Sequence, residues 1–253
     1  MKNSTINKVF VVLSVFLGAS SSVWATVYQE RDEINKSFTL PAKAAVEVVA
    51  INGSVDIKAI DGDTAIVEIE RTASSRAEMD CNKVVLRQVL GKLLIRSEMG
   101  CENVVVQVKH RVLLSLPRYV DLSVNGVSGP INIGEIDGAL RISGNSGQIN
   151  LAQAGRGSRI TGNSGTTTIN LRRLYAGGVW LIGHSGAIKL YIADESNIDV
   201  KVSGLSGTAS SELPNVKFIN TGAADYYARI GHGGPAIYVL GSSGSVTLIP
   251  YRE

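Results

Sequence analysis

Aliphatic and polar residues alternate on both sides of a short glycine turn, and this unit recurs along the second half of the chain. The clearest stretch runs from Ala139 to Leu171, where the phrase I-x-G-N-S-G occurs twice and its closing glycines, Gly147 and Gly165, are eighteen residues apart. Strict alternation over a few residues is typical of a strand with one buried face. Each unit therefore predicts two short strands joined by a tight turn.

The turn has the pattern G-x-S-G, and it recurs at a nearly constant interval. Successive closing glycines are 18, 18, 21, 21 and 37 residues apart. The last interval is interpreted as two repeats, with one degenerate copy near Gly222. A period close to twenty residues indicates a stacked repeat architecture. The six copies lie at 126–129, 144–147, 162–165, 183–186, 204–207 and 241–244.

One such unit cannot bury its apolar side, whereas units stacked about 4.8 Å apart share a continuous aliphatic interior. The sequence therefore predicts an all-β fold, a parallel β-solenoid (β-helix) with rungs of 18–21 residues. Glycine suits the corners because it permits positive φ and lets the next rung approach closely. The corner serines are expected to form a structural hydroxyl ladder along the axis: Ser128, Ser146, Ser164, Ser185, Ser206 and Ser243.

The repeat begins before this region and is interrupted once. Residues 46–69 show the same corner and strand offsets, and residues 82–100 have the pattern of an inserted antiparallel β-hairpin near the N-terminus. The main rung stack is expected over 119–249, with successive turns as successive rungs and an irregular part at 214–235. We therefore predict a single β-solenoid domain over 26–253, without a helix.

Two cysteines flank the expected hairpin. Gly91 is the midpoint between Cys81 and Cys101, so a hairpin that turns there would place the two thiols opposite each other. Their spacing does not match the C-x-x-C pattern of redox sites. In an exported protein such a pair favours a disulfide, whose closure contributes about 3 kcal/mol. The sequence thus predicts a Cys81–Cys101 disulfide.

Residues 1–25 have the features of a secretory signal peptide. Lys2 and Lys8 are followed by an apolar run, and small residues lead to an expected cleavage point after Ala25. The run is too short to span a bilayer. We expect an exported chain, periplasmic or extracellular and at the cell surface, with no transmembrane segment in its mature form.

The charge balance excludes one class of partner. The whole chain has 25 basic and 22 acidic residues, and the leader contains two of the lysines and no acid. The mature chain is therefore almost neutral. General nucleic-acid binding needs a strongly basic surface, so no nucleic-acid partner is expected.

One outward column has unusual chemistry. Cations and flat rings at rung spacing could hold an anionic sugar chain by charge, hydrogen bonds and stacking. Two adjacent arginines should also repel each other, which indicates a use. An ordinary solvated sheet face is the alternative. The column stands three residues before each corner and reads Ser123, Arg141, Arg159, Trp180, Lys201 and Tyr238; Arg172, Arg173 and Arg156 would extend the basic area.

The sequence predicts no catalytic site, cofactor or metal site. The corner 183–186 reads G-H-S-G, but the other five corners carry the serine without a histidine, and Ala187 breaks the G-x-S-x-G pattern of hydrolases. Glycoside hydrolysis needs two carboxylates about 5 to 9.5 Å apart. Asp137 and Asp194 fall three rungs apart, or about 14 Å. Structural roles are therefore expected for these residues.

Several segments together resemble the bacterial adhesin-like (β-strand-repeat) domain family. They are the leader, VEVVAINGSVDIKAIDGD at 46–63, the hairpin, LPRYVDLSVNGVSGPINI at 116–133, and the repeated S-G-x-I-x-[L/I] rungs. The resemblance covers most of the mature chain. It implies a β-strand-repeat solenoid with no established catalytic residues and a role in adhesion. The corner serine and the cysteine pair depart from the looser family pattern.

These observations predict an exported, non-enzymatic β-solenoid that acts as an adhesin-like or scaffold module of the cell envelope or surface. Its expected partner is an envelope or extracellular polysaccharide, or a surface protein, and the anionic glycan would bind at the outward column. Two alternatives stay open. One is a polysaccharide-degrading enzyme built on a β-helix, and the other is a periplasmic partner in an envelope-sensing pathway.

Overall fold

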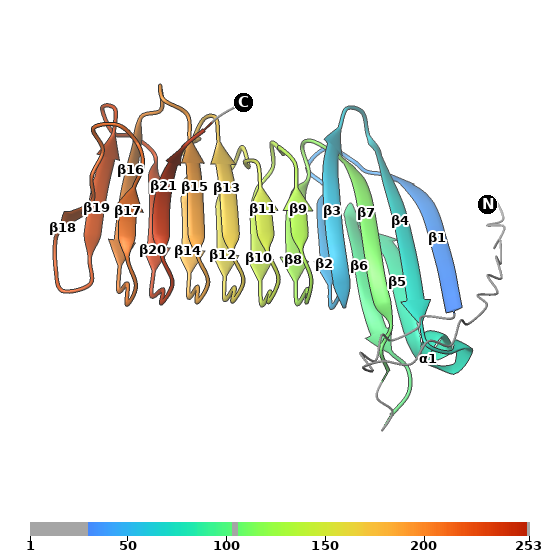
Figure 1. Cartoon of the computed structure of the whole chain (residues 1–253). Helices are drawn as coiled ribbons and strands as arrows, with labels where there is room; N and C mark the ends of the chain where they lie inside the picture. Colours follow the sequence, from blue (N-terminus) through green and yellow to red (C-terminus); the bar gives the residue numbers. More distant parts are fainter. Residues whose placement is uncertain (1–29, 103–105, 252–253) are drawn as a thin grey trace, which may run out of the picture.

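The computed structural model describes residues 30–102 and 106–251. The predicted signal peptide, residues 1–25, lies outside the described residues. Two long sheets face each other along the molecule and enclose its core (Figure 1). The fold is therefore all-β and largely parallel, like a β-solenoid, with an antiparallel part at its N-terminal end.

Each sheet extends along the whole length of the molecule (Figure 1). Sheet 1 has the spatial order β1 (Glu30–Thr39), β4 (Thr64–Ala73), β7 (Lys109–Pro117), β3 (Gly53–Ile60), β9 (Ile131–Ile133), β11 (Ile149–Leu151), β13 (Thr167–Leu171), β15 (Ile188–Ile192), β21 (Val246–Pro250) and β17 (Ala209–Ser211). Sheet 2 has the order β18 (Ile219–Asn220), β19 (Tyr226–Ile230), β16 (Ile198–Ser203), β20 (Ala236–Leu240), β14 (Val179–Ile182), β12 (Ser158–Thr161), β10 (Leu140–Ser143), β8 (Asp121–Asn125), β2 (Ala45–Val49), β6 (Lys92–Met99) and β5 (Asn82–Val89).

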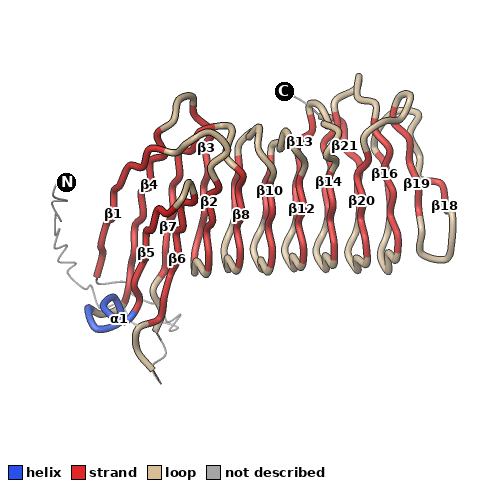
Figure 2. The backbone as a smooth tube through the Cα atoms, turned by 180° about the vertical axis from the view of Figure 1, so that it is seen from behind, coloured by secondary structure: helices blue, strands red, loops and turns tan. Residues whose placement is uncertain are grey.

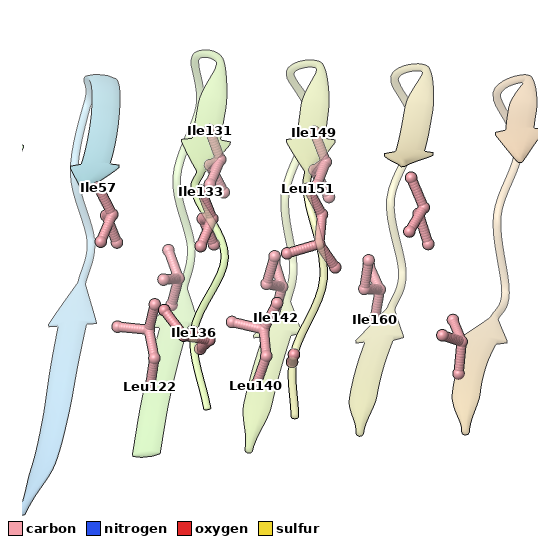
Figure 3. Close-up of a cluster of buried hydrophobic side chains, with 14 of the residues drawn as sticks. Ile57, Leu122, Ile131, Ile133, Ile136, Leu140, Ile142, Ile149, Leu151 and Ile160 are labelled. Carbon is pink, nitrogen blue, oxygen red and sulfur yellow. The ribbon is translucent and has the colours of Figure 1, made fainter. Parts of the chain in front are cut away.

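Rungs stack in parallel, and residues at the same position of the repeat lie over one another. In sheet 2, Leu140 pairs with Leu122 on one side and with Ser158 on the other. In sheet 1, Ile149 pairs with Ile131 and Thr167. The inward positions of the rungs form one large hydrophobic cluster along the axis, apart from a small cluster of Ala73, Met79 and Val108, and Figure 3 shows the central part of the large one. Because each buried Leu or Ile contributes about 1.5–3 kcal/mol, this interior is the main source of stability.

Glycine has two different tasks at the corners. The first glycine of each G-x-S-G turn adopts a left-handed conformation, as at Gly144 with φ 61°. The closing glycine instead allows close stacking: a Cβ on Gly165 would lie 2.2 Å from the carbonyl oxygen of Gly147. Any side chain there would collide with the backbone of the rung before it.

The order of the last rungs differs from the sequence prediction. The rung β20–β21, which comes last in the chain, lies between β14–β15 and β16–β17 (Figure 1). A Cβ on Gly244 would contact the backbone of Gly186, and one on Gly207 would contact Gly244. The prediction of rungs stacked in sequence order from 119 to 249 is therefore wrong at this end. Every rung presents the same corner and the same ladder of backbone groups, so the pattern alone does not fix the neighbours.

The segment 214–235 is not a degenerate rung. Its strands β18 and β19 run antiparallel, and β19 pairs with β16. Phe218 and Tyr226 meet edge to face, with ring centroids 6.5 Å apart, and both pack against the core cluster. The segment covers this end of the interior and ends the parallel stack.

The N-terminal end is antiparallel and also differs in detail from the prediction. Strands β1, β4 and β7 extend sheet 1 in antiparallel order, and β5 and β6 form the expected hairpin (Figure 2). Since β6 pairs in parallel with β2, the hairpin extends sheet 2 rather than looping out of the stack. A short helix, α1 (Arg76–Cys81), precedes it. The sequence pattern did not predict this helix, although Ser75 and Glu78 form a capping pair: the Ser75 side chain accepts a hydrogen bond from the backbone N–H of Glu78.

The predicted disulfide is confirmed. Cys81 and Cys101 are bonded, with 5.2 Å between their Cα atoms. The hairpin register is shifted by one residue from the predicted midpoint, because the turn uses both Leu90 and Gly91, and Asn82 pairs with Met99. Cys81 therefore faces Gly100, whose N–H donates to its carbonyl at 2.6 Å. The disulfide therefore joins Cys81 to Cys101, the residue that follows its direct neighbour Gly100 in the hairpin.

Candidate functional site

The outward column of sheet 2 forms a continuous row of cations and aromatic rings. We call it the aromatic–basic row; it crosses β10, β12, β14, β20 and β16 and contains, in spatial order, Arg141, Arg159, Trp180, Tyr238 and Lys201. These side chains point away from the core because the residues on either side of each, such as Leu140 and Ile142, are buried. Ser123 on β8 lies beside Arg141.

The centre of the row is a stack of two rings flanked by two cations. The rings of Trp180 and Tyr238 lie 4.0 Å apart with an interplanar angle of 17°. The Arg159 guanidinium lies 5.9 Å from the Trp180 ring centroid, and Lys201 Nζ lies 5.6 Å from that of Tyr238. Such cation–π contacts contribute about 0.5–1 kcal/mol at exposed sites. They hold the four side chains in one stack before any ligand arrives, with each ring face covered by a neighbouring ring or cation.

The inserted rung corrects the predicted order of this column. The order of the rungs in the sequence places Lys201 next to Trp180, but Tyr238 lies between them and contacts both. The insertion brings the two aromatic rings together, which the sequence order would have separated. The row is therefore more aromatic at its centre than predicted.

The arginine end of the row carries unpaired positive charge. Arg141 and Arg159 are direct neighbours in the register, and both are exposed. Neither guanidinium forms an ion pair with any residue that the structure describes. Like charges placed opposite each other on a sheet are destabilising. An anion that bridged these two side chains would remove that repulsion.

Tyr227, which the repeat pattern did not predict, extends the row at its other end. It pairs with Lys201 because β19 runs antiparallel to β16. Its hydroxyl donates to Asp199 Oδ1 at 2.5 Å, which raises the pKa of Tyr227. The Arg229 guanidinium lies 5.7 Å from its ring centroid and also donates to Asp199. The signal was absent from the repeat pattern because Tyr227 belongs to no G-x-S-G unit.

Solved structures of bacterial proteins resemble this chain over most of its length. A "putative cell adhesion protein" from Clostridium sporogenes is 12% identical, with a TM-score of 0.45, and the alignment covers 87% of this chain and 100% of that one. A "putative adhesin" from Bacteroides fragilis is 11% identical, with a TM-score of 0.40 and coverage of 86% and 97%. One from Parabacteroides distasonis is 9% identical, with a TM-score of 0.32 and coverage of 86% and 97%.

The predicted resemblance to adhesin-like proteins is confirmed as structural similarity. At these identities the likeness concerns the fold alone and says nothing of a ligand. No family model and no curated protein matches the chain.

The corner serines lie on the surface of one edge. Ser146 Oγ donates to the backbone carbonyl of Ser128 at 3.2 Å, and Ser128 Oγ donates to Asn52 Oδ1 at 2.9 Å. Among the described residues no hydrogen bond joins two of these hydroxyls, so their contacts run through the backbone and an amide instead. In the corner 183–186, Ser185 is exposed whereas His184 is buried. The two side chains therefore lie on opposite sides of the turn.

The other arginines of interest have partners along the opposite edge. Arg156 forms an ion pair with Asp121. Arg172 lies over the ring of Tyr251, at 5.7 Å, and Arg173 lies over that of Tyr175, at 5.6 Å. They do not continue the aromatic–basic row. Within residues 30–102 and 106–251, no group of three or more His, Cys, Asp or Glu side chains could hold a metal ion, and no helix is long and apolar enough to cross a membrane.

Proposed function

We propose that the chain is an extracytoplasmic, non-enzymatic binding module that holds an anionic glycan along the aromatic–basic row. The observation that carries the proposal is the preassembled stack Arg159–Trp180–Tyr238–Lys201 on an exposed sheet face. Carboxylate or sulfate groups pair with guanidinium and ammonium groups, and the Trp180 N–H and Tyr238 O–H at the ring edges can form hydrogen bonds to sugar hydroxyls.

The arrangement of the row favours the binding of a polymer over that of a small anion. Neighbouring strands are about 4.8 Å apart, so successive side chains offer contacts at regular intervals in a straight line. Unpaired Arg141 and Arg159 lie at one end, and Lys201 lies beyond the rings. A chain of acidic sugars lying across the strands would meet a cation on each side of the stacked pair.

The disulfide supports a location outside the cytoplasm, because such bonds persist in oxidising compartments. The regular stack supports a rigid module, since repeat folds of this kind present extended surfaces for contacts. The proposal of an adhesin-like or scaffold role in the envelope follows from these two features and the row.

Affinity electrophoresis through gels containing alginate or polygalacturonate tests the row. The variant R141A/R159A/W180A should lose at least about tenfold in affinity, because it removes two charges and one aromatic ring of the preassembled stack. The matched variant K83A/R87A removes the same charge from exposed positions on β5, so it controls for net charge. Retention should also weaken as salt is raised.

Unchanged retention of the triple variant would remove the row as the binding site. Release of reducing or unsaturated ends from these polysaccharides by the purified chain would contradict a non-enzymatic role and favour the glycan-degrading alternative.

A further inference from the structure

The outward face of sheet 1 carries a hollow with a different chemistry. Its volume is about 320 Å³, and it crosses β3, β9, β11 and β13. Apart from Gly134, the outward residues that line it are Asp56, Lys58, Asn132, Asn150, Ala152 and Asn170. Amides dominate this set, in contrast to the rings and arginines of the other face.

One side of the hollow is a directional chain of hydrogen bonds. Asn150 Nδ2 donates to Asn132 Oδ1 at 2.8 Å, and Asn132 Nδ2 donates to Asp56 Oδ1 at 2.6 Å. The register places these three residues side by side on neighbouring strands. Each amide uses one N–H in the chain and keeps the other for a ligand. The donors are therefore fixed in direction before binding.

The floor of the hollow consists of small residues between larger ones. Gly134 and Ala152 lie between Lys58 and Asn170. A Cβ on Gly134 would lie 3.5 Å from the nearest atom, the Ile57 carbonyl oxygen, so the backbone does not require glycine here by contact. The concavity thus results from short side chains on an otherwise regular sheet.

The far side of the hollow has unused polar groups. The Asn170 amide makes no hydrogen bond, and Lys58 makes no ion pair, with any residue that the structure describes. Tyr191 pairs with Asn170 in the register and places a half-buried ring beside it. A donor, an acceptor and a flat ring therefore lie together at this end.

We propose that this hollow binds a segment of a neutral, hydroxyl-rich glycan that runs across the strands. Amide groups both donate to and accept from hydroxyl groups, and they recur at strand spacing, about 4.8 Å. The single carboxylate and the single ammonium group cancel, so the hollow does not select for charge.

An extended peptide fits the hollow less well. The strands beneath it are interior strands of sheet 1, whose backbone groups are paired with neighbours on both sides. No free strand edge is therefore offered for main-chain pairing. The side-chain amides are the available recognition groups, and their match is to hydroxyls.

The two sheets face each other across the core, so the hollow and the aromatic–basic row lie on opposite outward faces (Figures 1 and 2). If the proposed function of the row also holds, one molecule bridges a neutral and an acidic polymer. The neutral site stands without the row, and its test does not use an acidic probe.

Affinity electrophoresis and calorimetry with neutral probes test the hollow: dextran, mannan and cello-oligosaccharides. The chain without its predicted leader should bind at least one of them. N150A/N170A should bind it about five- to tenfold more weakly, because each lost hydrogen bond is worth a few-fold in affinity. A152L should abolish binding by filling the floor. S210L adds the same side chain to an exposed position of the same sheet outside the hollow and should bind normally.

Absence of binding to every neutral probe overturns the proposal, and so does binding that A152L leaves unchanged at an unchanged melting temperature. The variant R141A/R159A should retain neutral binding in full. If it loses acidic retention while neutral binding survives, both sites stand. If only one probe class fails, only the corresponding site falls.

Discussion

At each corner, the side chain that packs into the interior belongs to residue x of G-x-S-G, whereas the serine is exposed. Val127, Asn145, Asn163, His184 and Leu205 are all buried at this position. Asn145 Nδ2 donates to Asn163 Oδ1 at 3.2 Å, so part of the column satisfies itself. The buried His184 ring has no such bond, because neither of its nitrogens has a hydrogen-bond partner. An unpaired buried ring of this kind costs stability at any pH and more when it is charged.

The first prediction concerns acid stability. Burial lowers the pKa of His184 to about 4. The nearby backbone of Ile182 opposes this shift in part, although no full hydrogen bond to the ring is formed. Burial, together with the charge of Arg71, lowers the pKa of His110 to about 4 as well. The unfolded chain then binds more protons than the folded one below the ordinary pKa of 6.5. Stability should be full above about pH 6.5 and fall as the pH drops toward 4.

Urea unfolding between pH 4 and 7 measures this effect. H184L should flatten the fall, since leucine occupies the same corner position as Leu205 and takes up no proton. H232L, at an exposed histidine, is the control and should leave the profile unchanged. A wild-type profile that is flat from pH 7 to 4 would refute the assignment.

The second prediction concerns the corner as an element. G165A places a methyl group 2.2 Å from the Gly147 carbonyl oxygen, a contact with backbone that cannot turn away. The free energy of unfolding should fall by about 3 kcal/mol or more, because the two rungs must separate locally. G134A, where the nearest atom is 3.5 Å away, should change it by less than about 1 kcal/mol. Thermal melts of both variants check the contrast, and equal melting temperatures would contradict the close-stacking role.

The sequence pattern predicted which residues face inward but not which rungs are neighbours. Alternation around Gly144 and Gly162 identifies strands and their buried sides, because the side-chain period of a strand is two. It does not distinguish whether Lys201 lies against Trp180 or Tyr238, since each rung offers the same backbone ladder. Strand β19 and helix α1 were missed for another reason: they lie outside the repeat and are held by tertiary contacts and by a local cap. The outward row was predictable as a column, and its central aromatic stack was not.

At the scale of the whole molecule, the C-terminal rung, β20 and β21, connects the end unit to the rest of the stack; we call this inserted rung the wedge. Strands β20 and β21 pair with β14 and β15 on one side and with β16 and β17 on the other. Their buried side chains, Ile237, Val239, Val246 and Leu248, fill the interior between the two rungs. In a stacked fold each rung depends on its neighbours. The end unit is thus joined to the rest of the stack largely through the last residues of the chain.

The third prediction follows from this wedge. Deletion of residues 236–253 should release β16 to β19 while residues 30–192 stay folded, because the remaining rungs keep their partners from β1 to β15. Amide hydrogen exchange should show lost protection over 198–230 and retained protection in β8 to β13. The full chain, measured in parallel, is the reference for both regions. Full protection of 198–230 in the shortened chain would show instead that β16 and β17 restack directly on β14 and β15. The corner geometry permits that outcome, because Gly207 could take the place of Gly244 against Gly186, so the experiment decides whether the wedge or the repeat itself holds the end of the molecule.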